Sequence, residues 1–280
     1  MVVLEPEARP RRRSRWFTRL RVTQVAFLIA ILAAWQFLPS IAPLAAQFRV
    51  FNRFFIGSPL GVVDRIGALL AGSPLYPMAL PLLGVTIRDA VIGIVIGVAF
   101  GALVGLLLSA SPLGANVFRP FIATLSAVPR IAFIPIVVVI AGPTSQSSII
   151  VSALVVFFAT FFNAFEGGRS VKPELLDNVY LLGARPFESM MRVRLPFVLA
   201  WTVVALPAAA GFGLVGTVVT QVLTGVPGIG QLLITSMQAA DATTTIALAI
   251  LLGALGLGLT GIATLLRRTL LFWWVEGAAS

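Results

Sequence analysis

The sequence of 280 residues contains no cysteine and no histidine. Without cysteine there is no disulfide, thiolate metal site or cysteine nucleophile, and without histidine there is no histidine-based zinc or haem site and no Ser-His-Asp triad. The single lysine, Lys172, precedes Pro173, so the Gly-Lys-Ser/Thr sequence of a P-loop is missing too. These absences exclude most familiar catalytic sites and a P-loop ATP site within the chain.

Charge is also scarce. Charged residues make up 11% of the chain, compared with about 25% in ordinary soluble proteins. Hydrophobic residues make up 59%, and the mean hydropathy is +1.02. So few charges cannot cover a soluble surface of this size, and several apolar runs reach the ~20 residues that a helix needs to cross a bilayer. The sequence therefore predicts an all-α integral membrane protein.

The distribution of basic residues gives the expected orientation. Seven arginines precede the first apolar run, and basic residues beside a spanning helix stay in the cytoplasm, where they meet anionic lipid. The tract also resembles a twin-arginine or Sec leader, but a retained helix fits a chain that is membrane-embedded throughout. With both termini cytoplasmic, fifteen of the twenty basic residues lie inside, so we expect a membrane-lipid partner and no nucleic acid. The six expected spans lie near residues 22–39, 84–110, 117–141, 146–167, 197–223 and 244–266.

Glycine and proline are dense within these spans. A glycine at every fourth position between Gly93 and Gly105 predicts close helix packing. Pro129 and Pro135 in the third span and Pro207 in the fifth are expected to kink or locally open their helices. Before the second span, Gly57-Ser58-Pro59 predicts the start of an amphipathic helix on the outer face, which either covers the bundle or docks a partner.

Residues 168–196 are unlike the rest because they are rich in charge. Pro173 and Glu174 suit the first turn of a short helix, and Gly183 suits a left-handed helix stop. Pro186 then opens a second helix that continues to Pro196, which is expected to mark the joint with the fifth span. The segment is exposed and partly apolar, so it either lies on the membrane surface or docks into a groove on a partner.

The spacing of residues in this segment resembles a known signature. Asp177, Gly183, Val193, Leu195 and Pro196 stand at the positions of the "EAA" signature of binding-protein-dependent ABC transporter permeases. The similarity extends over roughly residues 55–270 and is strongest to the nitrate/sulfonate/taurine group. Two positions depart from the pattern: Asp177-Asn178-Val179 replaces Glu-Ala-Ala, and Gln221 replaces a membrane glutamate, so any charge role at that position is lost.

The resemblance implies a type I ABC importer (MetI-like) permease fold of about six transmembrane helices with a cytoplasmic coupling helix. It further implies a permease homodimer in the bacterial inner membrane, two copies of an ATPase subunit that bind ATP and Mg, and an extracytoplasmic substrate-binding protein. No cofactor is expected in this chain, and it is not expected to be an enzyme. The residues that the resemblance assigns to coupling are Lys172, Glu174, Asp177, Gly183, Ala184, Arg185 and Pro196. The alternative is that Gly183 only stops a helix and Arg185 only contacts lipid.

Three polar residues within the spans are candidates for the substrate pathway. A charge such as that of Arg130 is expensive in a membrane and usually faces the interior or water, where it would attract an anion such as nitrate, a sulfonate or taurine. Arg130 could instead satisfy carbonyls freed by the neighbouring prolines. Asn163 and Gln221 line the pathway or form interhelical hydrogen bonds.

The chain is accordingly divided into four parts. These are a basic cytoplasmic tail (1–21), the first transmembrane helix with the outer amphipathic segment (22–83), the permease core (84–268) with its coupling loop (168–196), and a cytoplasmic C-terminal tail (269–280). A membrane enzyme is disfavoured because the spans offer no paired carboxylates. The remaining alternative is a secondary transporter or channel that works without an ATPase, although midspan carboxylates and internal repeats typical of ion-coupled carriers are missing.

Overall fold

A computed structural model describes residues 13–37, 39, 56–72, 78–111, 117, 124 and 129–272, with side chains described from residue 21 onward. The described residues are helical and contain no strand, as expected from the sequence. The elements in chain order are α1 (Arg13–Phe37), α4 (Pro59–Ala71), α5 (Ala79–Ser109), η3 (Arg130–Phe133), α7 (Ile134–Ala141), α8 (Ser145–Arg169), α9 (Pro173–Leu181), α10 (Pro186–Ser189), η4 (Met190–Arg194), α11 (Leu195–Thr224), α12 (Ile229–Gln238) and α13 (Ala242–Leu270).

Four of these helical segments are long and apolar enough to cross a membrane. They are α5, α8, α13 and the continuous segment Pro186–Thr224, which joins α10, η4 and α11. Two shorter apolar segments, Arg21–Phe37 in α1 and Arg130–Ala141 in η3 and α7, correspond to the first and third predicted spans. Apart from Val117 and Thr124, the third predicted span before residue 129 lies outside the described residues. The expected membrane protein of about six helices is thus confirmed.

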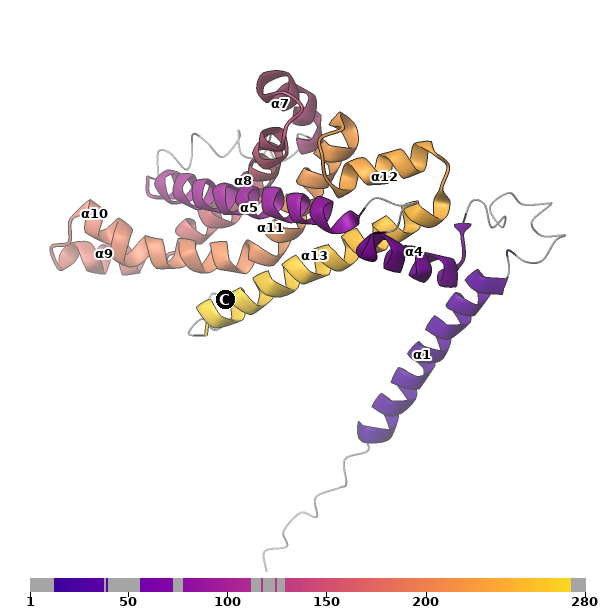
Figure 1. The fold of residues 1–280 in the computed structure, drawn as a ribbon. Coiled ribbons are helices and arrows are strands. Elements are labelled where there is room, and N and C mark those ends of the chain that lie inside the picture. The colour runs from indigo at the N-terminus through magenta and orange to yellow at the C-terminus, as the bar shows by residue number, and fades with distance from the viewer. Residues whose placement is uncertain are drawn as a thin grey trace, which may run out of the picture.

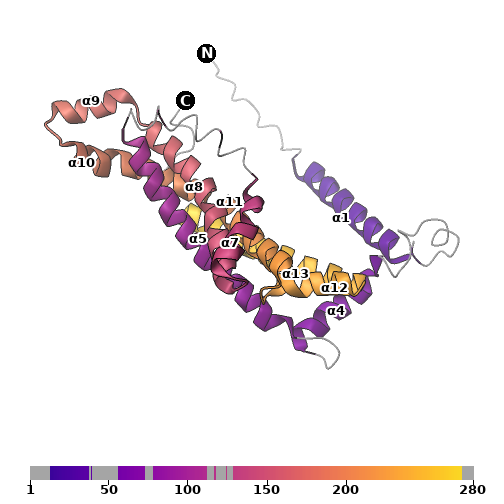
Figure 2. The ribbon, with the colours of Figure 1, turned by 90° about the horizontal axis from the view of Figure 1, so that it is seen from above.

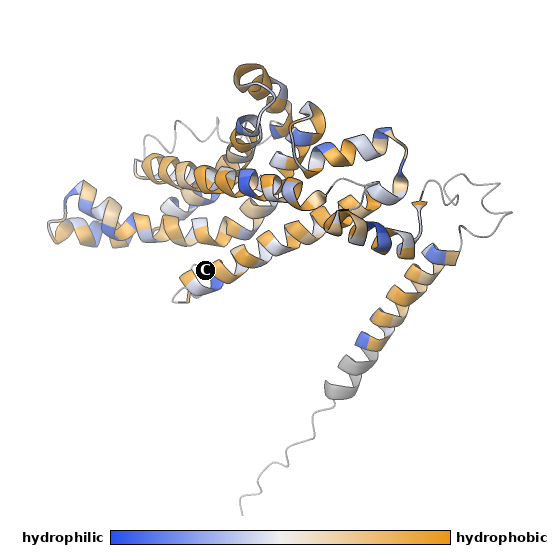
Figure 3. Cartoon of the chain, in the orientation of Figure 1, coloured by the Kyte–Doolittle hydropathy of each residue, from blue (hydrophilic) through white to orange (hydrophobic). Residues whose placement is uncertain are grey.

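The bundle is elongated, with two distinct ends. Helices α9 and α10 project from one end, and α12 and α4 lie at the other (Figures 1 and 2). Helix α1 stands apart from the bundle and contacts α4, and the indole N–H of its Trp35 donates to the carbonyl of Ile56, just before α4, at 3.0 Å. Apolar residues dominate the surfaces of the long helices, and polar residues gather at the ends (Figure 3). This distribution suits a bundle whose sides face lipid.

The centre of the bundle is formed by α5, α8 and α11. Half of the most apolar stretch of α8 is buried, compared with 17% for α13, so α8 is central and α13 peripheral. The glycine stripe explains the close contact: a Cβ added to Gly97 would lie 2.6 Å from the carbonyl oxygen of Ala153, and Gly93, Gly101 and Gly105 face α8 in the same way. The prediction of close packing along this stripe is confirmed.

The prolines act differently from one another. Pro129 precedes the 3-10 turn η3, and Pro135 lies in the first turn of α7, so helical geometry changes there as expected. Pro207 lies within α11, which runs through it as one helix.

The joint predicted at Pro196 is a change of helix geometry and not a break. The helix is continuous from Pro186 to Thr224, and it changes from the π-helical segment η4 to α11 at Leu195, so that Pro196 lies in the first turn of α11. There the N–H of Leu195 donates to the carbonyl of Met190, five residues back. Because Pro196 has no N–H and its ring crowds the preceding turn, the wider π turn carries the helix past the proline.

Candidate coupling loop and transport pathway

The 168–196 loop begins where α8 ends and turns back through α9. Lys172 is the extended residue before α9, Pro173 opens the helix, and Glu174 stands in its first turn near the positive end of the helix dipole. Asp177 follows one turn later in α9. The predicted first helix is therefore confirmed, and its charged residues lie on an element that extends beyond the bundle (Figure 1).

Gly183 forms the turn between the two loop helices. Its φ of +86° lies in the left-handed region that favours glycine, and an added Cβ would meet nothing within 4 Å. The N–H of Gly183 donates to Tyr180 at 2.9 Å and that of Ala184 to Val179 at 3.2 Å, which is the pairing of a Schellman stop. The backbone conformation, and not crowding, requires glycine here.

Arg185 is the residue before α10. Its backbone N–H donates to the Glu188 carboxylate at 3.0 Å, so Glu188 reaches back to close the first turn. The Arg185 backbone therefore helps to start the helix, and both loop helices have defined ends.

Apolar side chains are exposed at the tip of the loop. Leu181 is 85% exposed, Leu182 88% and Phe187 66%. A hollow between the two helices lies beside them, lined by Val179, Leu182, Gly183, Ala184, Glu188 and Arg192. Large apolar residues this exposed on a charged projection favour a protein or lipid contact.

Arg130 lies at the start of η3 with its guanidinium over an aromatic ring. Its Cζ atom is 5.9 Å from the centroid of the Phe212 ring in α11, within the range of a cation–π contact. Within the part of the chain that the structure describes, Arg130 forms no ion pair with a carboxylate. Its positive charge is therefore not neutralised by a described side chain.

Gln221 forms interhelical hydrogen bonds, the alternative to a pathway role, whereas Asn163 does not. The amide of Asn163 donates to the Ala159 carbonyl of its own helix at 2.8 Å. The carbonyl oxygen of Gln221, which is fully buried, accepts from the Thr86 hydroxyl at 3.0 Å and from the Gly230 N–H at 3.1 Å. Gln221 thus links α11 to α5 and α12, and the three pathway candidates share no hydrogen bond.

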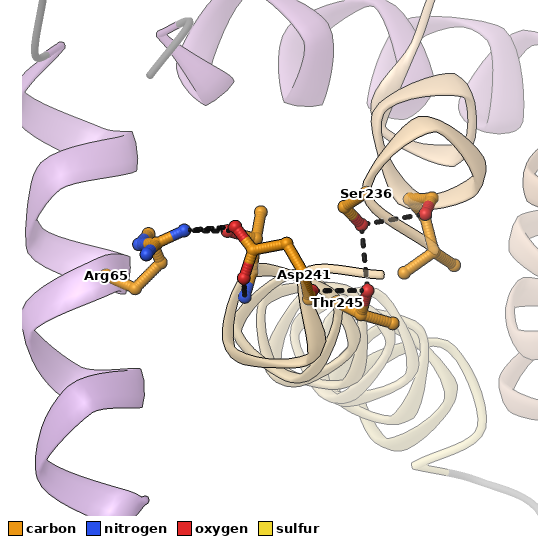
Figure 4. Close-up of polar contacts among 6 residues, drawn as sticks. Arg65, Ser236, Asp241 and Thr245 are labelled. Carbon is orange, nitrogen blue, oxygen red and sulfur yellow. Dashed lines mark hydrogen bonds and ion pairs between the residues drawn. The ribbon is translucent and has the colours of Figure 1, made fainter. Parts of the chain in front are cut away.

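A second polar cluster ties α4 to the beginning of α13. Arg65 donates to the Asp241 carboxylate at 2.6 Å and to the hydroxyl of Thr244, while Ser236 and Thr245 share a hydrogen bond of 3.0 Å (Figure 4). Burial would raise the pKa of Asp241, but hydrogen bonds from Thr244 and Arg65 together with the positive charge of Arg65 outweigh it and lower that pKa. The cluster therefore holds α4 against the start of α13 at the α12 end of the bundle.

Several of these residues carried no role in the sequence analysis. Asp241 stood just before an apolar run, where an acidic helix cap is typical. Thr86 and Arg65 gave no signal, because their partners are far away along the chain. Across the described ranges, no group of three or more His, Cys, Asp or Glu could hold a metal ion.

Comparison of the chain with known protein families identifies its family. Residues 93–271 match the model of the family described as "Binding-protein-dependent transport system inner membrane component". The chain belongs to this family. The match covers the glycine stripe, the 168–196 loop and the last three long helices, and the chain is accordingly a multi-pass ABC transporter permease of the importer type.

Curated relatives point to the sulfonate and taurine group. The chain is 24% identical over 263 residues to the putative aliphatic sulfonates transport permease protein SsuC of Bacillus subtilis, covering 94% of this chain and 90% of the relative. It is 27% identical to SsuC of Escherichia coli, with 91% and 92% covered. The taurine transport system permease protein TauC of Escherichia coli is 24% identical, with 82% of each chain covered.

A solved structure shows a similar fold. A chain of the MetNI methionine ABC transporter in an inward-facing conformation has a TM-score of 0.53 and 18% sequence identity, covering 75% of this chain and 96% of that chain. This similarity concerns the fold, and it agrees with the MetI-like permease fold expected from the sequence.

Proposed function

We propose that this chain forms the membrane pathway of an ABC importer for a small sulfonate-like anion and that a separate ATPase drives it through the 168–196 loop. The observation that carries the proposal is the loop itself: two short helices with defined ends, joined at Gly183, that expose Leu181, Leu182 and Phe187. An apolar projection of this kind fits a groove on a partner.

The proposal assigns the coupling residues to two tasks. Lys172, Glu174 and Asp177 give α9 its charged surface, while Gly183, Ala184 and Arg185 hold the turn and the start of α10. ATP and Mg would bind to the partner, and the missing P-loop in this chain agrees with that division. The family description, which names binding-protein-dependent systems, supports an external substrate-binding protein, and a homodimer with two ATPase copies completes the proposed assembly.

Co-purification tests the coupling proposal. The tagged chain, extracted gently from its native membrane, should recover a P-loop ATPase. Leu182→Asp should abolish that recovery, because it puts a charge where we expect an apolar contact. Val63→Asp is the matched control: Val63 is 65% exposed on α4, at the opposite end of the bundle, and its replacement should leave recovery unchanged.

Two results would oppose the proposal. If the unaltered chain recovered no ATPase, a secondary transporter or channel would become the better explanation, and ion-flux assays would follow. If Leu182→Asp retained the ATPase as well as the control did, the loop would not be the docking element.

We further propose that Arg130 attracts the anionic substrate. Sulfonate and taurine permeases among the relatives support an anion, and Arg130 presents a charge without a described carboxylate partner. Arg130→Gln should lower anion uptake at least tenfold while ATPase recovery is kept, and Arg130→Lys should restore part of the uptake. Uptake by Arg130→Gln within twofold of the unaltered chain would show a structural arginine instead.

A further inference from the structure

The ends of α5 and α8 meet the beginning of α11 at Arg194. Its Nη1 atom donates to the carbonyl of Ser109, the last residue of α5, at 2.7 Å. The same nitrogen donates to the carbonyl of Gly168, at the end of α8, at 3.3 Å. One guanidinium therefore bridges two helices that are distant from it in sequence.

The chemistry of helix ends explains why an arginine suits this place. The last four carbonyls of a helix have no N–H partner within the helix, and that end carries a partial negative charge. α5 and α8 run in the same direction and end side by side (Figures 1 and 2). The half-buried guanidinium of Arg194 lies between them and donates to one terminal carbonyl of each helix.

The junction around Arg194 is tightly packed. Gly168 has no side chain, and a Cβ there would meet the Ser109 side chain and approach Val198 to 3.1 Å. Leu106, Ala164 and Val198 form a buried cluster against which Met190 and Leu195 pack. The residues on both sides of Arg194 thus hold the three helices in one unit, which leaves little room for independent movement.

Arg194 also closes the π turn η4, which directly follows the loop helix α10. Such turns are rare and are frequent at functional sites. We infer that Arg194 is a positioning residue that carries displacement of the 168–196 loop to the ends of α5 and α8. This inference rests on the proposed function, because it requires an ATPase that moves the loop.

The test compares Arg194 with an arginine outside the loop. Arg194→Gln removes the cation from the two helix ends, whereas Arg268→Gln alters an exposed arginine in the last turn of α13. Each variant is reconstituted with its ATPase and binding protein, and the anion taken up per ATP hydrolysed is measured beside ATPase recovery. A purely structural role would lower recovery and hydrolysis together and leave this ratio unchanged.

We expect Arg194→Gln to lower the ratio at least tenfold, with ATPase recovery and basal hydrolysis within twofold, and Arg268→Gln to match the unaltered chain. Equal ratios for the two variants would overturn the inference. Should Arg194→Gln fail to assemble, Arg194→Lys decides: a ratio below half of the unaltered value supports the inference and an unchanged ratio overturns it. An unaltered chain that recovers no ATPase would instead refute the proposed function, and the inference with it.

Discussion

The Gln221 side chain lies where α5, α11 and α12 meet, and it accepts hydrogen bonds from two of these elements. Thr86 completes the link, because its hydroxyl donates to Gln221 and accepts from the Ile229 N–H at 3.0 Å. An amide makes these bonds without placing a charge in an apolar interior, which would be expensive. Because Gln221 does not titrate, this link between the elements is independent of pH.

Asp241, by contrast, gives the α12 end a dependence on pH. The pKa of Asp241 is lowered in the folded chain, so its ionised form stabilises the fold. This stabilisation is complete when the pH lies above the ordinary Asp pKa of about 3.9, and it is lost progressively as the pH falls through the lowered pKa of the folded chain. We expect Asp241→Asn to lower the thermal midpoint at pH 7 by no more than about 2–4 °C, since the partly exposed ion pair with Arg65 contributes about 1 kcal/mol at most. The difference between the two proteins should shrink towards pH 3.

Thermal unfolding in detergent at a series of pH values measures this effect. Arg65→Gln combined with Asp241→Asn is the control, and it should be hardly less stable than Asp241→Asn alone, because the pair is already broken. A difference between Asp241→Asn and the unaltered chain that stayed constant from pH 7 to pH 3 would contradict the assigned ion pair.

The residues that could be recognised from the sequence are those that act on their neighbours along the chain. Ser58 caps α4 by accepting from the Gly61 N–H at 3.2 Å, and Gly183 ends α9, both as expected. Arg194 and Thr86 act on partners 85 and 135 residues away, and no local pattern announces such contacts. Local chemistry is readable from sequence, whereas long-range polar contacts depend on the packed fold.

At the scale of elements, the close packing of α5 against α8 depends on the glycines of α5, which carry a hydrogen atom where other residues carry a side chain. A Cβ at Gly97 would lie 2.6 Å from the Ala153 oxygen and 2.7 Å from the Val156 Cβ, so the two helices would have to separate. We expect Gly97→Ala to destabilise the protein by about 1–3 kcal/mol, the usual penalty for overpacking.

The control for this substitution lies on the same helix. Gly84 is exposed and its added Cβ would meet nothing within 4 Å, so Gly84→Ala should be neutral or slightly stabilising. Thermal midpoints in detergent, read from the monodisperse peak in size-exclusion chromatography, measure both variants. Equal midpoints for the two would show that the stripe is not a close contact.

Two elements were not predicted, for different reasons. α12 has only ten residues and lies between the fifth and sixth predicted spans, where the sequence analysis assigned no element. The π turn lies directly before a proline within a long continuous helix, and the proline by itself predicted only a joint between two helices. Long apolar helices such as α5 and α13 were predicted well, because their length and composition leave few alternatives.

At the scale of the whole molecule, α9 and α12 lie at opposite ends of the bundle, and the basic residues favour the α9 end inside the cell. The chain has no cysteine, so single cysteines can report orientation directly. Glu174→Cys should react with a membrane-impermeant maleimide only in inside-out vesicles, and Gln238→Cys only in intact spheroplasts. The reverse pattern would invert the proposed topology.

The unbroken helix from Pro186 to Thr224 joins the two ends of the molecule as a lever does. At about 1.5 Å per residue its 39 residues extend about 58 Å, and Pro207 lies near the middle. A tilt of about 5° around that point would move the two tips about 2.5 Å in opposite directions, as on a see-saw. A displacement of the Pro186 end of this helix would therefore move the end beside Gln221 in the opposite direction. Closer helix packing at one end of the bundle and looser packing at the other would then result from one tilt.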